Sequence, residues 1–463
     1  MNPMRSANAE ASVSTRRTSF EHMIVTIDGP AGSGKSTTAS MLARRLGLLY
    51  LDTGAMYRGV THVVLERGID PEDEAAVVSA AEGIALEFRP ADDGPQLYID
   101  GANVSKEIRS PEVSRFVSPV SRYTGVRRAM VRIQRSIART GGVVAEGRDT
   151  GSVVFPYADV RVFLVADIGS RSERRKRQLT DMGIEQTLDE IRDNILRRDE
   201  IDSGRAHSPL VKPAGALLVD TTELSIHEQV AIIEKAAVDE AARLERIRTG
   251  KGERNEFASM RAYYRITRGA IRLFWRIFFG LRIAGSGHLR YRERCLFASN
   301  HVSYADPLVA GCALDREVAF VAKKELFRNR LFGWLIRTYN AIPIDRDEID
   351  RGALKTISSK LAAGKSILMF PEGTRSKDGS IGELKAGLGF IALHNGATVV
   401  PMHVSGTDDL LRCMLRLRRL EARIGPPIRM PEGYTPADRK SEYRILSAMV
   451  QEEMRMLRDE SEA

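Results

Sequence analysis

The chain has 463 residues, of which 43% are hydrophobic and 28% charged, and this ordinary globular composition excludes a disordered or fibrous protein. Its formal net charge of +9 indicates acidic partners such as nucleotides, nucleic acid or anionic lipid, without choosing among them. The three widely spaced cysteines, Cys295, Cys312 and Cys413, exclude a disulfide framework and a cysteine metal site, so we expect a reducing compartment.

Residues 1–20 lack the apolar core of a secretory signal, and we expect a disordered tail there. A β-branched run, Met23–Asp28, predicts a buried strand, and a glycine-rich turn leads from it into a helical pattern at Ser36–Leu46. Further strand-like runs then alternate with helical patterns: Val143–Ala145, Val160–Val165 and Leu217–Val219 among Val126–Arg139, Ser170–Asp181 and Leu188–Arg198. This alternation is typical of an α/β fold in which helices flank a parallel sheet.

Two more strand-like runs, Ala85–Phe88 and Gln96–Ile99, flank an Asp-Gly pair and predict a small β insert on that core. A helical pattern over residues 225–248 is followed by a polar, glycine-containing segment at 249–256, which is typical of a domain boundary. We therefore predict a first domain over residues 21–240, a linker over 241–256 and a second domain over 257–463.

The second domain is also predicted to be α/β. Its strand-like runs lie near Cys295–Ser299, Val318–Ala322, Ser366–Phe370 and Ala397–Val404. No internal repeat relates the two halves, so they are not duplicates of one domain. No stretch of the chain approaches the roughly 18 consecutive apolar residues of a transmembrane helix, so we expect any membrane contact to be peripheral.

The glycine-rich turn reads GPAGSGKS over residues 29–36 and matches the phosphate-binding pattern G-x-x-x-x-G-K-[ST] in full. Its glycines let backbone N–H groups surround phosphate oxygens, and the following helix N-terminus favours an anion. Lys35 is suited to reach the terminal phosphates, and the Ser36 hydroxyl is suited to bind the Mg²⁺ that accompanies ATP. The predicted ATP-binding residues of this loop are Gly29, Pro30, Ala31, Gly32, Ser33, Gly34, Lys35, Ser36 and Thr37.

Three further motifs narrow the substrate. LDTGAMYR spans residues 51–58, VAEGRDTG spans 144–151, and R-D-x-x-D-x-x-R spans 198–205 before Ser-Pro-Leu. With these motifs the chain resembles, over roughly residues 21–239, the bacterial cytidylate kinase family of P-loop nucleoside monophosphate kinases. The resemblance implies transfer of a phosphoryl group from ATP to CMP or dCMP.

The resemblance also implies roles for individual residues. The CMP-binding set comprises arginines for the acceptor phosphate, groups that read cytosine and groups that hold the ribose: Arg58, Arg148 and Arg205; Thr53, Arg127 and Asp149; Arg198 and Asp202. Arg171, Arg174 and Arg175 share one helix face and would close over the donor ATP. Because the acceptor is itself a phosphate oxygen, we expect catalysis by positioning and charge neutralisation, with Lys35 as the catalytic residue and no essential base.

The second half contains a histidine and an aspartate five residues apart, His301 and Asp306, just after an apolar run. Three blocks follow in order: Ile-Asp-Arg at 344–346, FPEGTRS at 370–376 and Val-Pro-Met at 400–402. Together these blocks resemble the glycerolipid acyltransferase family, specifically enzymes that acylate 1-acyl-glycerol-3-phosphate, over about residues 257–457. Two positions depart from the usual family pattern, Pro343 and Met402, and they leave the acyl-chain and acceptor preference open.

Acyl transfer from a thioester to an alcohol requires that the hydroxyl lose its proton, a task suited to a histidine base oriented by a carboxylate. His301 is therefore the predicted base and Asp306 its orienting partner. Guanidinium groups match phosphate geometry. The implied acceptor-binding residues are Arg346, Glu372, Gly373, Thr374 and Arg375, with Glu372 expected to hold Arg375 or a glycerol hydroxyl.

The segment Met260–Ile283 predicts an amphipathic helix at the start of the second domain. Arginines form one stripe at positions 261, 265, 268, 272 and 276, and the other side carries Tyr264, Ile271, Phe274, Trp275, Phe278 and Leu281. A basic face against an aromatic face is typical of a helix that lies in an anionic membrane surface. The aromatic segment 327–339 could join it. The alternative is a helix that packs on the acyltransferase core and leaves its arginines in solvent.

These observations predict a bifunctional enzyme of pyrimidine metabolism and phospholipid biosynthesis. It would make CDP from CMP with ATP and Mg²⁺, and phosphatidate from lysophosphatidate with acyl-CoA or acyl-carrier protein as the donor. We expect it in the cytoplasm, peripherally bound to the inner face of the membrane. One alternative is an acyltransferase regulated by a kinase-like module that binds nucleotide without turnover. A nucleic-acid partner is not expected, because the basic residues lie in phosphate-site motifs and no recognition module is present.

Overall fold

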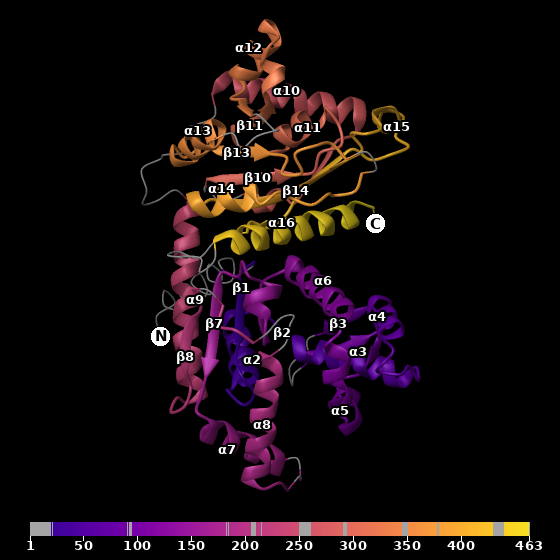
Figure 1. The fold of residues 1–463 in the computed structure, drawn as a ribbon, viewed down its shortest axis with the longest axis vertical. Helices are drawn as coiled ribbons and strands as arrows, with labels where there is room; N and C mark the ends of the chain where they lie inside the picture. The colour runs from indigo at the N-terminus through magenta and orange to yellow at the C-terminus, as the bar shows by residue number, and fades with distance from the viewer. Residues whose placement is uncertain are drawn as a thin grey trace, which may run out of the picture. The chain divides into compact units, whose positions relative to one another are not determined.

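The computed structural model describes residues 20, 22–89, 91, 95–181, 183, 185–204, 210–213, 215–249, 261–289, 294–344, 351–376, 379–428 and 439–462. The chain forms two compact units, Met1–Arg243 and Leu244–Ala463 (Figure 1). Each unit has its own sheet and its own core, and they are described separately below. The predicted α/β class is therefore confirmed for both halves.

The N-terminal unit is built on a five-stranded sheet in the order β2-β6-β1-β7-β8, and all of its neighbouring strands are parallel. The strands are β1 Ile24–Asp28, β2 Leu49–Asp52, β6 Val143–Gly147, β7 Val160–Val165 and β8 Leu217–Asp220. Strand β2 was not predicted, because the four residues LYLD carry no buried apolar run and only Leu51 is buried. The other four strands are confirmed within two residues at their ends.

The helices of this unit are α2 Lys35–Leu46, α3 Thr53–Glu66, α4 Glu74–Glu82, α5 Pro111–Ser121, α6 Thr124–Thr140, α7 Ile168–Asp181, α8 Leu188–Ser203 and α9 Ile226–Thr249. Helices α2 and α9 lie against the parallel sheet, whereas α4 and α5 lie beside α3 (Figure 1). Two short helical turns lie at Glu107–Arg109 and Thr150–Val154. Apolar faces of α2 and α9 pack on β1 and β7 around Ile27, Leu42, Leu164 and Ile233. Helix α9 continues into the segment predicted as a linker, and the rest of that linker, 250–256, lies outside the described residues.

The predicted β insert is present as a separate antiparallel sheet. It contains β3 Leu86–Arg89, β4 Gln96–Ile99 and a third short strand, β5 Ala102–Asn103. The turn between β4 and β5 uses Asp100 and Gly101, both at positive φ, as an Asp-Gly turn requires. The first Asp-Gly pair, at 93–94, lies outside the described residues.

The C-terminal unit has a seven-stranded sheet in the order β12-β11-β13-β10-β14-β15-β9, in which only the β14–β15 pair is antiparallel among the described strands. Its strands are β9 Arg282–Ala284, β10 Cys295–Ser299, β11 Val318–Lys323, β12 Ile342–Ile344, β13 Ser366–Met369, β14 Thr398–Ser405 and β15 Glu421–Ile424. The four predicted strands are confirmed. The three others were missed because their short sequences, RIA, IPI and EARI, contain charged residues or a proline and carry no continuous apolar run.

The helices of this unit are α10 Ala262–Phe279, α11 Asp306–Ala313, α12 Arg330–Thr338, α13 Arg351–Ala362, α14 Gly387–Asn395, α15 Leu410–Met414 and α16 Arg439–Glu462, with short turns at Ser286–Leu289 and Lys324–Phe327. Helix α16 runs along β14 and α14 (Figure 1). Helix α11 packs on the sheet around Phe297, Val309 and Leu368. No described helix has both the length and the apolar character that a bilayer-spanning segment needs.

Helix α10 is shorter than its prediction at both ends and divides its aromatic residues between core and solvent. Tyr264 and Trp275 are buried, and Trp275 belongs to the hydrophobic core. Phe274 and Phe278, which were assigned to the same face, are exposed. The helix therefore packs on the domain core along one narrow stripe and leaves a second apolar stripe in solvent.

Candidate active sites

The phosphate-binding loop lies between β1 and α2, and its glycines adopt backbone conformations that other residues rarely reach. Gly29, Gly32 and Gly34 have φ of 151°, 76° and 91°. A Cβ on Gly29 would lie 2.2 Å from the Leu164 carbonyl oxygen, so only glycine fits between this loop and β7. The Ser33 hydroxyl donates to the Pro30 carbonyl at 3.0 Å and closes the loop. The loop thus ends in the N-terminus of α2, where a phosphate is favoured.

The side chains of Lys35 and Ser36 both form hydrogen bonds to other residues of the protein. Lys35 Nζ donates to the Pro30 carbonyl at 2.7 Å, and Ser36 Oγ donates to Glu146 Oε1 at 2.8 Å. Burial, and then the charge of Arg148, lower the pKa of Lys35 to about 7. Burial, and then the charge of Asp52, raise the pKa of Glu146 to about 7.

The group around Ser36 fits the Mg²⁺ that accompanies ATP. Glu146 is 6% exposed, and its second oxygen, Oε2, is buried without a hydrogen-bond partner. An unsatisfied buried carboxylate oxygen is costly, and a hard cation would relieve that cost. Ser36 Oγ and Glu146 Oε2 are therefore the groups of this chain that could face the metal, whose remaining ligands would be phosphate oxygens and water.

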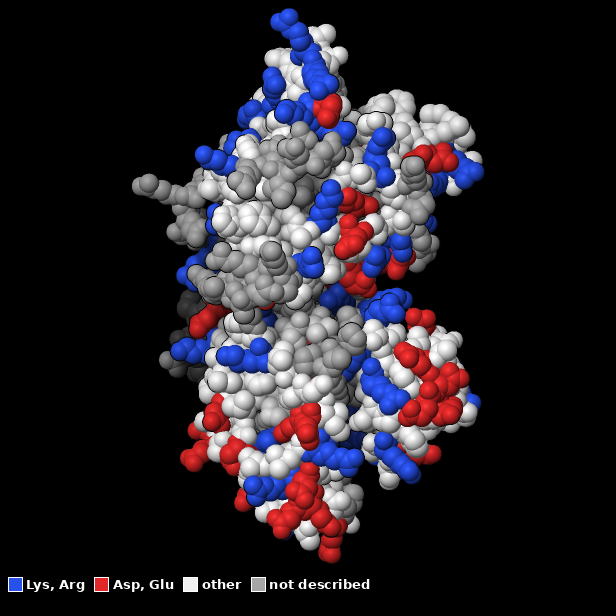
Figure 2. Space-filling view, in the orientation of Figure 1, with Lys and Arg blue, Asp and Glu red and all other residues white. Residues whose placement is uncertain are grey.

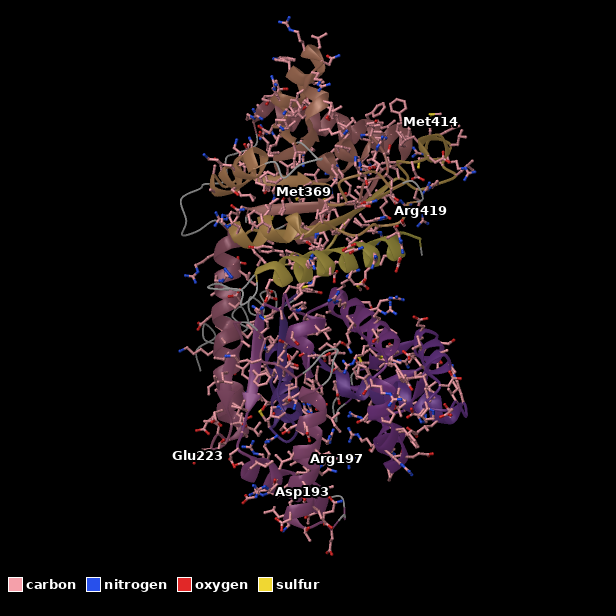
Figure 3. All side chains as sticks on the ribbon, viewed as in Figure 1. Asp193, Arg197, Glu223, Met369, Met414 and Arg419 are labelled. Carbon is pink, nitrogen blue, oxygen red and sulfur yellow. The ribbon has the colours of Figure 1, made fainter. Side chains whose placement is uncertain are left out.

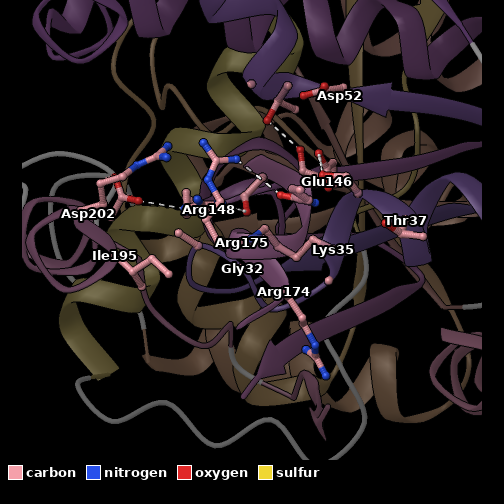
Figure 4. Close-up of a pocket in the computed structure, with 18 of the residues that line it drawn as sticks. Gly32, Lys35, Thr37, Asp52, Glu146, Arg148, Arg174, Arg175, Ile195 and Asp202 are labelled. Carbon is pink, nitrogen blue, oxygen red and sulfur yellow. Dashed lines mark hydrogen bonds and ion pairs between the residues drawn. The ribbon is translucent and has the colours of Figure 1, made fainter. Parts of the chain in front are cut away.

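On the acceptor side, arginine–aspartate pairs connect elements that are distant in sequence. Arg127 on α6 pairs with Asp149 after β6 at 2.9 Å, and both side chains are 8% exposed. Arg148 Nε pairs with Asp202 Oδ2 on α8 at 2.8 Å (Figure 4). Each ion pair fixes the position of one guanidinium group and one carboxylate group, both of which can bind a polar ligand. Both join residues that the sequence assigned to one nucleotide site.

Arg58 and Thr53 lie beside these pairs, at the N-terminus of α3. Arg58 Nη2 pairs with Asp52 Oδ2 at 3.0 Å, which aims the guanidinium over the start of that helix. The Thr53 hydroxyl donates to the Glu146 carbonyl at 2.7 Å, so its oxygen remains able to accept from a cytosine amino group. Burial, and then the charge of Arg148, lower the pKa of Arg198 on α8.

These groups surround one cavity of about 890 Å³, large enough for two nucleotides to lie end to end (Figure 4). The predicted site residues that line it are Ala31, Gly32, Gly34, Lys35, Ser36, Thr37, Thr53, Arg58, Arg127, Arg148, Asp149, Arg174, Arg175, Arg198 and Asp202. The other loop residues, Gly29, Pro30 and Ser33, do not line the cavity, and the Pro30 carbonyl accepts hydrogen bonds from Ser33 and Lys35 within the loop. The predicted Arg205 lies outside the described residues.

Of the arginines assigned to a lid over ATP, Arg171 and Arg174 hold the cavity wall instead of facing free into the cavity. Arg171 is buried, pairs with Asp199 and donates to the Ala31 carbonyl at 3.2 Å. Arg174 donates to Thr221 Oγ1 at 3.0 Å at the end of β8. Their predicted role toward the nucleotide stays a prediction, whereas their contacts to the phosphate-binding loop and to β8 are structural.

Two buried residues that the motifs did not identify fix the loop after β6. Asp28, at the end of β1, accepts hydrogen bonds from the Thr150 N–H, the Thr150 hydroxyl and the Gly151 N–H at 2.7–2.9 Å. Burial raises the pKa of Asp28 to about 6. Arg135 on α6 donates to the Val154 carbonyl at 2.8 Å. An acid next to a phosphate loop is the signal that could have identified Asp28.

The second site lies where two neighbouring parallel strands of the C-terminal sheet end. Strands β10 and β13 pair in register, so the loop after β10, with His301, lies beside the loop after β13, with Glu372. Polar side chains at the carboxyl ends of parallel strands converge on one edge of a sheet. Met369, the last residue of β13, is labelled in Figure 3.

The His301–Asp306 pair has the geometry predicted for an oriented base. His301 Nδ1 lies 2.8 Å from Asp306 Oδ2, and the carboxylate can only accept, so Nδ1 carries the proton and Nε2 is free to accept one. The Val302 and Ser303 N–H groups donate to the same oxygen at 2.7 Å each. Asp306 is fully buried and opens helix α11. The His301 ring packs on the Phe370 ring at 4.4 Å between centroids.

Glu372 is tied to the backbone and does not hold Arg375 as expected. Its Oε1 accepts the His301 N–H at 3.0 Å, and its Oε2 accepts the Gly382 N–H at 3.1 Å. Arg375 instead lies over the exposed ring of Tyr304, with its guanidinium carbon 3.9 Å from the ring centroid.

The FPEGTRS loop and the histidine loop form one unit. The Ser376 N–H donates to the His301 carbonyl at 2.8 Å, so both sides of the histidine peptide are bound by this loop. Gly373 has φ of 78°, and a Cβ there would lie 2.9 Å from the Lys385 side chain. Thr374 and Arg375 are exposed beside it. Arg346, the other predicted acceptor arginine, lies outside the described residues.

Comparison with known proteins separates the same two halves. The family model described as "Cytidylate kinase" matches residues 25–238, and the one described as "Acyltransferase" matches residues 280–405. A cytidylate kinase of Enterococcus faecalis is 44% identical over 210 residues, which cover 45% of this chain and 93% of that protein. One of Carboxydothermus hydrogenoformans is 45% identical over 209 residues, covering 45% of this chain and 94% of that protein. A solved structure of the 1-acyl-sn-glycerophosphate acyltransferase PlsC from Thermotoga maritima is 24% identical and covers 44% of this chain and 85% of its own, with a TM-score of 0.34.

Proposed function

The N-terminal half of this chain belongs to the cytidylate kinase family, its C-terminal half carries an acyltransferase domain, and we propose that it phosphorylates CMP or dCMP and acylates lysophosphatidate. The observation that carries the kinase proposal is the single cavity that joins the phosphate-binding loop to the two arginine–aspartate pairs. The observation that carries the acyltransferase proposal is the His301–Asp306 pair at the sheet edge.

In the kinase, the phosphate-binding loop holds the ATP phosphates while the arginines hold the acceptor. Ser36 and Glu146 are the groups that would hold the Mg²⁺ of the ATP complex, which would supply charge neutralisation at the phosphates. Lys35 exchanges the Pro30 carbonyl for phosphate oxygens. Arg58 and Arg148 orient the CMP phosphate in line, and Arg127 with Asp149 reads the cytosine edge.

In the acyltransferase, His301 acts as the base toward the acceptor hydroxyl. Its Nε2 takes the hydroxyl proton as the oxygen attacks the thioester carbonyl, and the C–S bond then breaks to release the thiol, which receives that proton. Asp306 holds Nδ1–H and stabilises the imidazolium that forms. Arg375, exposed beside Tyr304, is placed to bind the acceptor phosphate. The thioester is that of acyl-CoA or an acyl-carrier protein.

A lipid acceptor calls for contact with a membrane, and we place that contact on the C-terminal unit. Helix α10 exposes Ile266, Leu273, Phe274, Ile277 and Phe278, and α12 exposes Leu331, which is 83% exposed, and Trp334. Basic side chains gather at the end of the unit that carries α12 (Figure 2). Exposed apolar groups of this density among arginines fit the surface of an anionic membrane. The proposed location is the cytoplasmic face of the membrane.

The segment around α15 extends this apolar surface. Arg416 Nη2 donates to the Ile277 carbonyl at 2.7 Å and joins the segment to the end of α10. Leu411, Met414, Leu415 and Leu417 are exposed there, and Leu417 is 75% exposed. Met414 and the nearby Arg419 are labelled in Figure 3. This part of the surface was not identified from the sequence.

The kinase proposal is tested by ADP release from the purified full-length chain with ATP and Mg²⁺ and each of CMP, dCMP, UMP and AMP. We expect turnover with CMP or dCMP that is lost in Lys35→Ala, because this residue holds the transferred phosphate. Turnover with UMP or AMP in place of CMP would contradict the base-reading assignment. Tight nucleotide binding without turnover would favour the regulatory module.

The acyltransferase proposal is tested with the same protein and radiolabelled lysophosphatidate, using acyl-CoA and acyl-carrier protein in parallel. We expect phosphatidate formation that falls by about 10²–10⁴-fold in His301→Ala, the range of general-base catalysis. His394→Ala, an exposed histidine of the same unit, is the matched control and should leave the rate unchanged. A fully active His301→Ala protein would exclude the proposed mechanism.

A further inference from the structure

Asp306 is bound on both of its carboxylate oxygens, and one of its partners comes from outside every motif described above. Oδ2 accepts three hydrogen bonds, from His301 Nδ1 and from the Val302 and Ser303 N–H groups. Oδ1 accepts one, from the Thr407 hydroxyl at 2.5 Å. Asp306 has no exposed surface and Thr407 is 2% exposed, so this bond is shielded from water.

The chain reaches this position through a turn that needs glycine. Thr407 follows β14 and Gly406, which has φ of 85°. A Cβ on Gly406 would lie 2.4 Å from the Arg419 carbonyl oxygen. The Gly406 carbonyl in turn accepts a bond from the Cys413 thiol at 3.3 Å. The loop is therefore held in one conformation, and that conformation presents the Thr407 hydroxyl to Asp306.

The end of β14 is also tied to the residue before the histidine. The Asn300 side-chain amide donates to the Val404 carbonyl at 2.9 Å and accepts the Val404 N–H at 2.7 Å. This pair of hydrogen bonds fixes how far the Thr407 loop lies from the His301 loop. The hydroxyl and the imidazole thus approach the same carboxylate from two segments whose separation is set by Asn300.

We propose that Thr407 is a positioning residue of the acyltransferase, whose hydroxyl fixes the rotation of the Asp306 carboxylate so that Oδ2 faces His301 Nδ1. A carboxylate with donors on one oxygen alone could turn about its Cβ–Cγ bond and share the other oxygen with the imidazole or with water. With Thr407 bonded, Oδ1 is occupied and the imidazole keeps a single orientation. The inference rests on the proposed role of His301 as the base.

The physical size of the effect follows from the environment of the bond. A hydrogen bond to a charged acceptor, when lost from a buried site, leaves an unsatisfied carboxylate oxygen. For one such bond we expect an effect on the rate of roughly 10–100-fold. Because Thr407 is buried and its hydroxyl bonds to Asp306, the change should fall on kcat and leave the KM for lysophosphatidate within about two-fold.

The experiment compares Thr407→Val, which keeps the shape and removes the hydroxyl, with Thr407→Ser, which keeps the hydroxyl. Thr398→Val is the matched control, because Thr398 is also buried and lies at the opposite end of β14. Acyl transfer is measured as kcat and KM. The low-field proton resonance of His301 Nδ1–H reports the bond to Asp306 without turnover. Tryptophan fluorescence reports folding, since both tryptophans of the chain, Trp275 and Trp334, lie in this unit.

The inference is supported if Thr407→Val loses kcat, Thr407→Ser restores it to within about three-fold, and the resonance shifts or broadens in Thr407→Val alone. It is overturned if Thr407→Val keeps its kcat while His301→Ala is inactive, or if a folded Thr407→Ser is as impaired as Thr407→Val. A fully active His301→Ala would overturn the proposed base itself. These outcomes keep the two failures apart. Where Thr407→Val does not fold, a folded Thr407→Ser whose kcat lies more than about ten-fold below that of the unchanged protein overturns the inference.

Discussion

His403 on β14 makes the stability of the C-terminal unit depend on pH in a predictable direction. The side chain is buried, and its Nδ1 has no hydrogen-bond partner. Burial, and then the charges of Arg458 and Arg423, lower its pKa from 6.5 to about 4. The unfolded chain therefore takes up a proton near pH 6.5, whereas the folded chain takes it up only near pH 4. The free energy of unfolding that depends on a neutral His403 is therefore fully present above pH 6.5 and is lost as the pH falls toward 4.

The magnitude follows from the two pKa values. At pH 5 the unfolded state is favoured by about 2 kcal/mol through this one group, and at pH 7 by almost nothing. Replacing His403 with glutamine removes the titration. We therefore expect that the free energy of unfolding falls between pH 7 and pH 5 by about 2 kcal/mol less in His403→Gln than in the unchanged protein.

Urea unfolding at pH 7, 6 and 5, followed by tryptophan fluorescence, measures this difference in the C-terminal unit alone. Both tryptophans lie there, and Trp275 is buried in the core. His394→Gln is the control, because His394 is exposed, and its pH dependence should equal that of the unchanged protein. Parallel curves for His403→Gln and the unchanged protein would refute the reasoning.

Three further predictions concern the two sites and the membrane surface. Glu146→Gln should raise by about 10-fold the Mg²⁺ concentration that half-saturates the binding of an ATP analogue, measured by calorimetry, and should leave the binding of ADP without Mg²⁺ unchanged. Glu173→Gln, at an exposed residue that lines the same cavity, is the control, and an equal Mg²⁺ dependence in the Glu146 and Glu173 variants would remove Glu146 from the metal site. Gly406→Ala should lower the rate of acyl transfer by about 10-fold or more through backbone strain, while the rate of CMP phosphorylation in the same preparation stays unchanged. An unaffected rate of acyl transfer would show that the turn relaxes. Leu331→Gln combined with Trp334→Gln should weaken sedimentation with phosphatidylglycerol vesicles, whereas full retention would move the contact elsewhere.

The phosphate-binding loop and the His301–Asp306 pair were predictable because each is a short contiguous motif that must follow a strand. The strand and helix around the loop are set by local patterning, and the structure confirms them at β1 and α2. The existence of three further strands of that sheet, β6, β7 and β8, follows from the same periodicity. What the patterns missed are short strands such as β2 and β9, whose residues carry too little apolar signal.

Roles that depend on partners far along the chain were not predictable in the same way. The sequence left Glu372 to hold either Arg375 or a glycerol hydroxyl, and the structure shows that its carboxylate accepts two backbone N–H groups and does not hold Arg375. It placed Phe274 and Trp275 on one face of a helix, but only the second packs on the core. Each outcome depends on which neighbouring segment lies nearest, and helical or strand periodicity carries no information about that neighbour.

The sequence by itself therefore determined that two α/β halves follow one another, one with a phosphate-binding loop and one with a histidine and an aspartate five residues apart, because each of these motifs lies within a few positions of the chain. The tertiary structure decided how those residues are held. Asp28, Glu146 and Thr407 act across more than 100 positions, as partners of Thr150, Ser36 and Asp306 respectively. Such pairs form only when sheet order brings distant strand ends to one edge, and burial then makes each unsatisfied oxygen costly enough to require its partner.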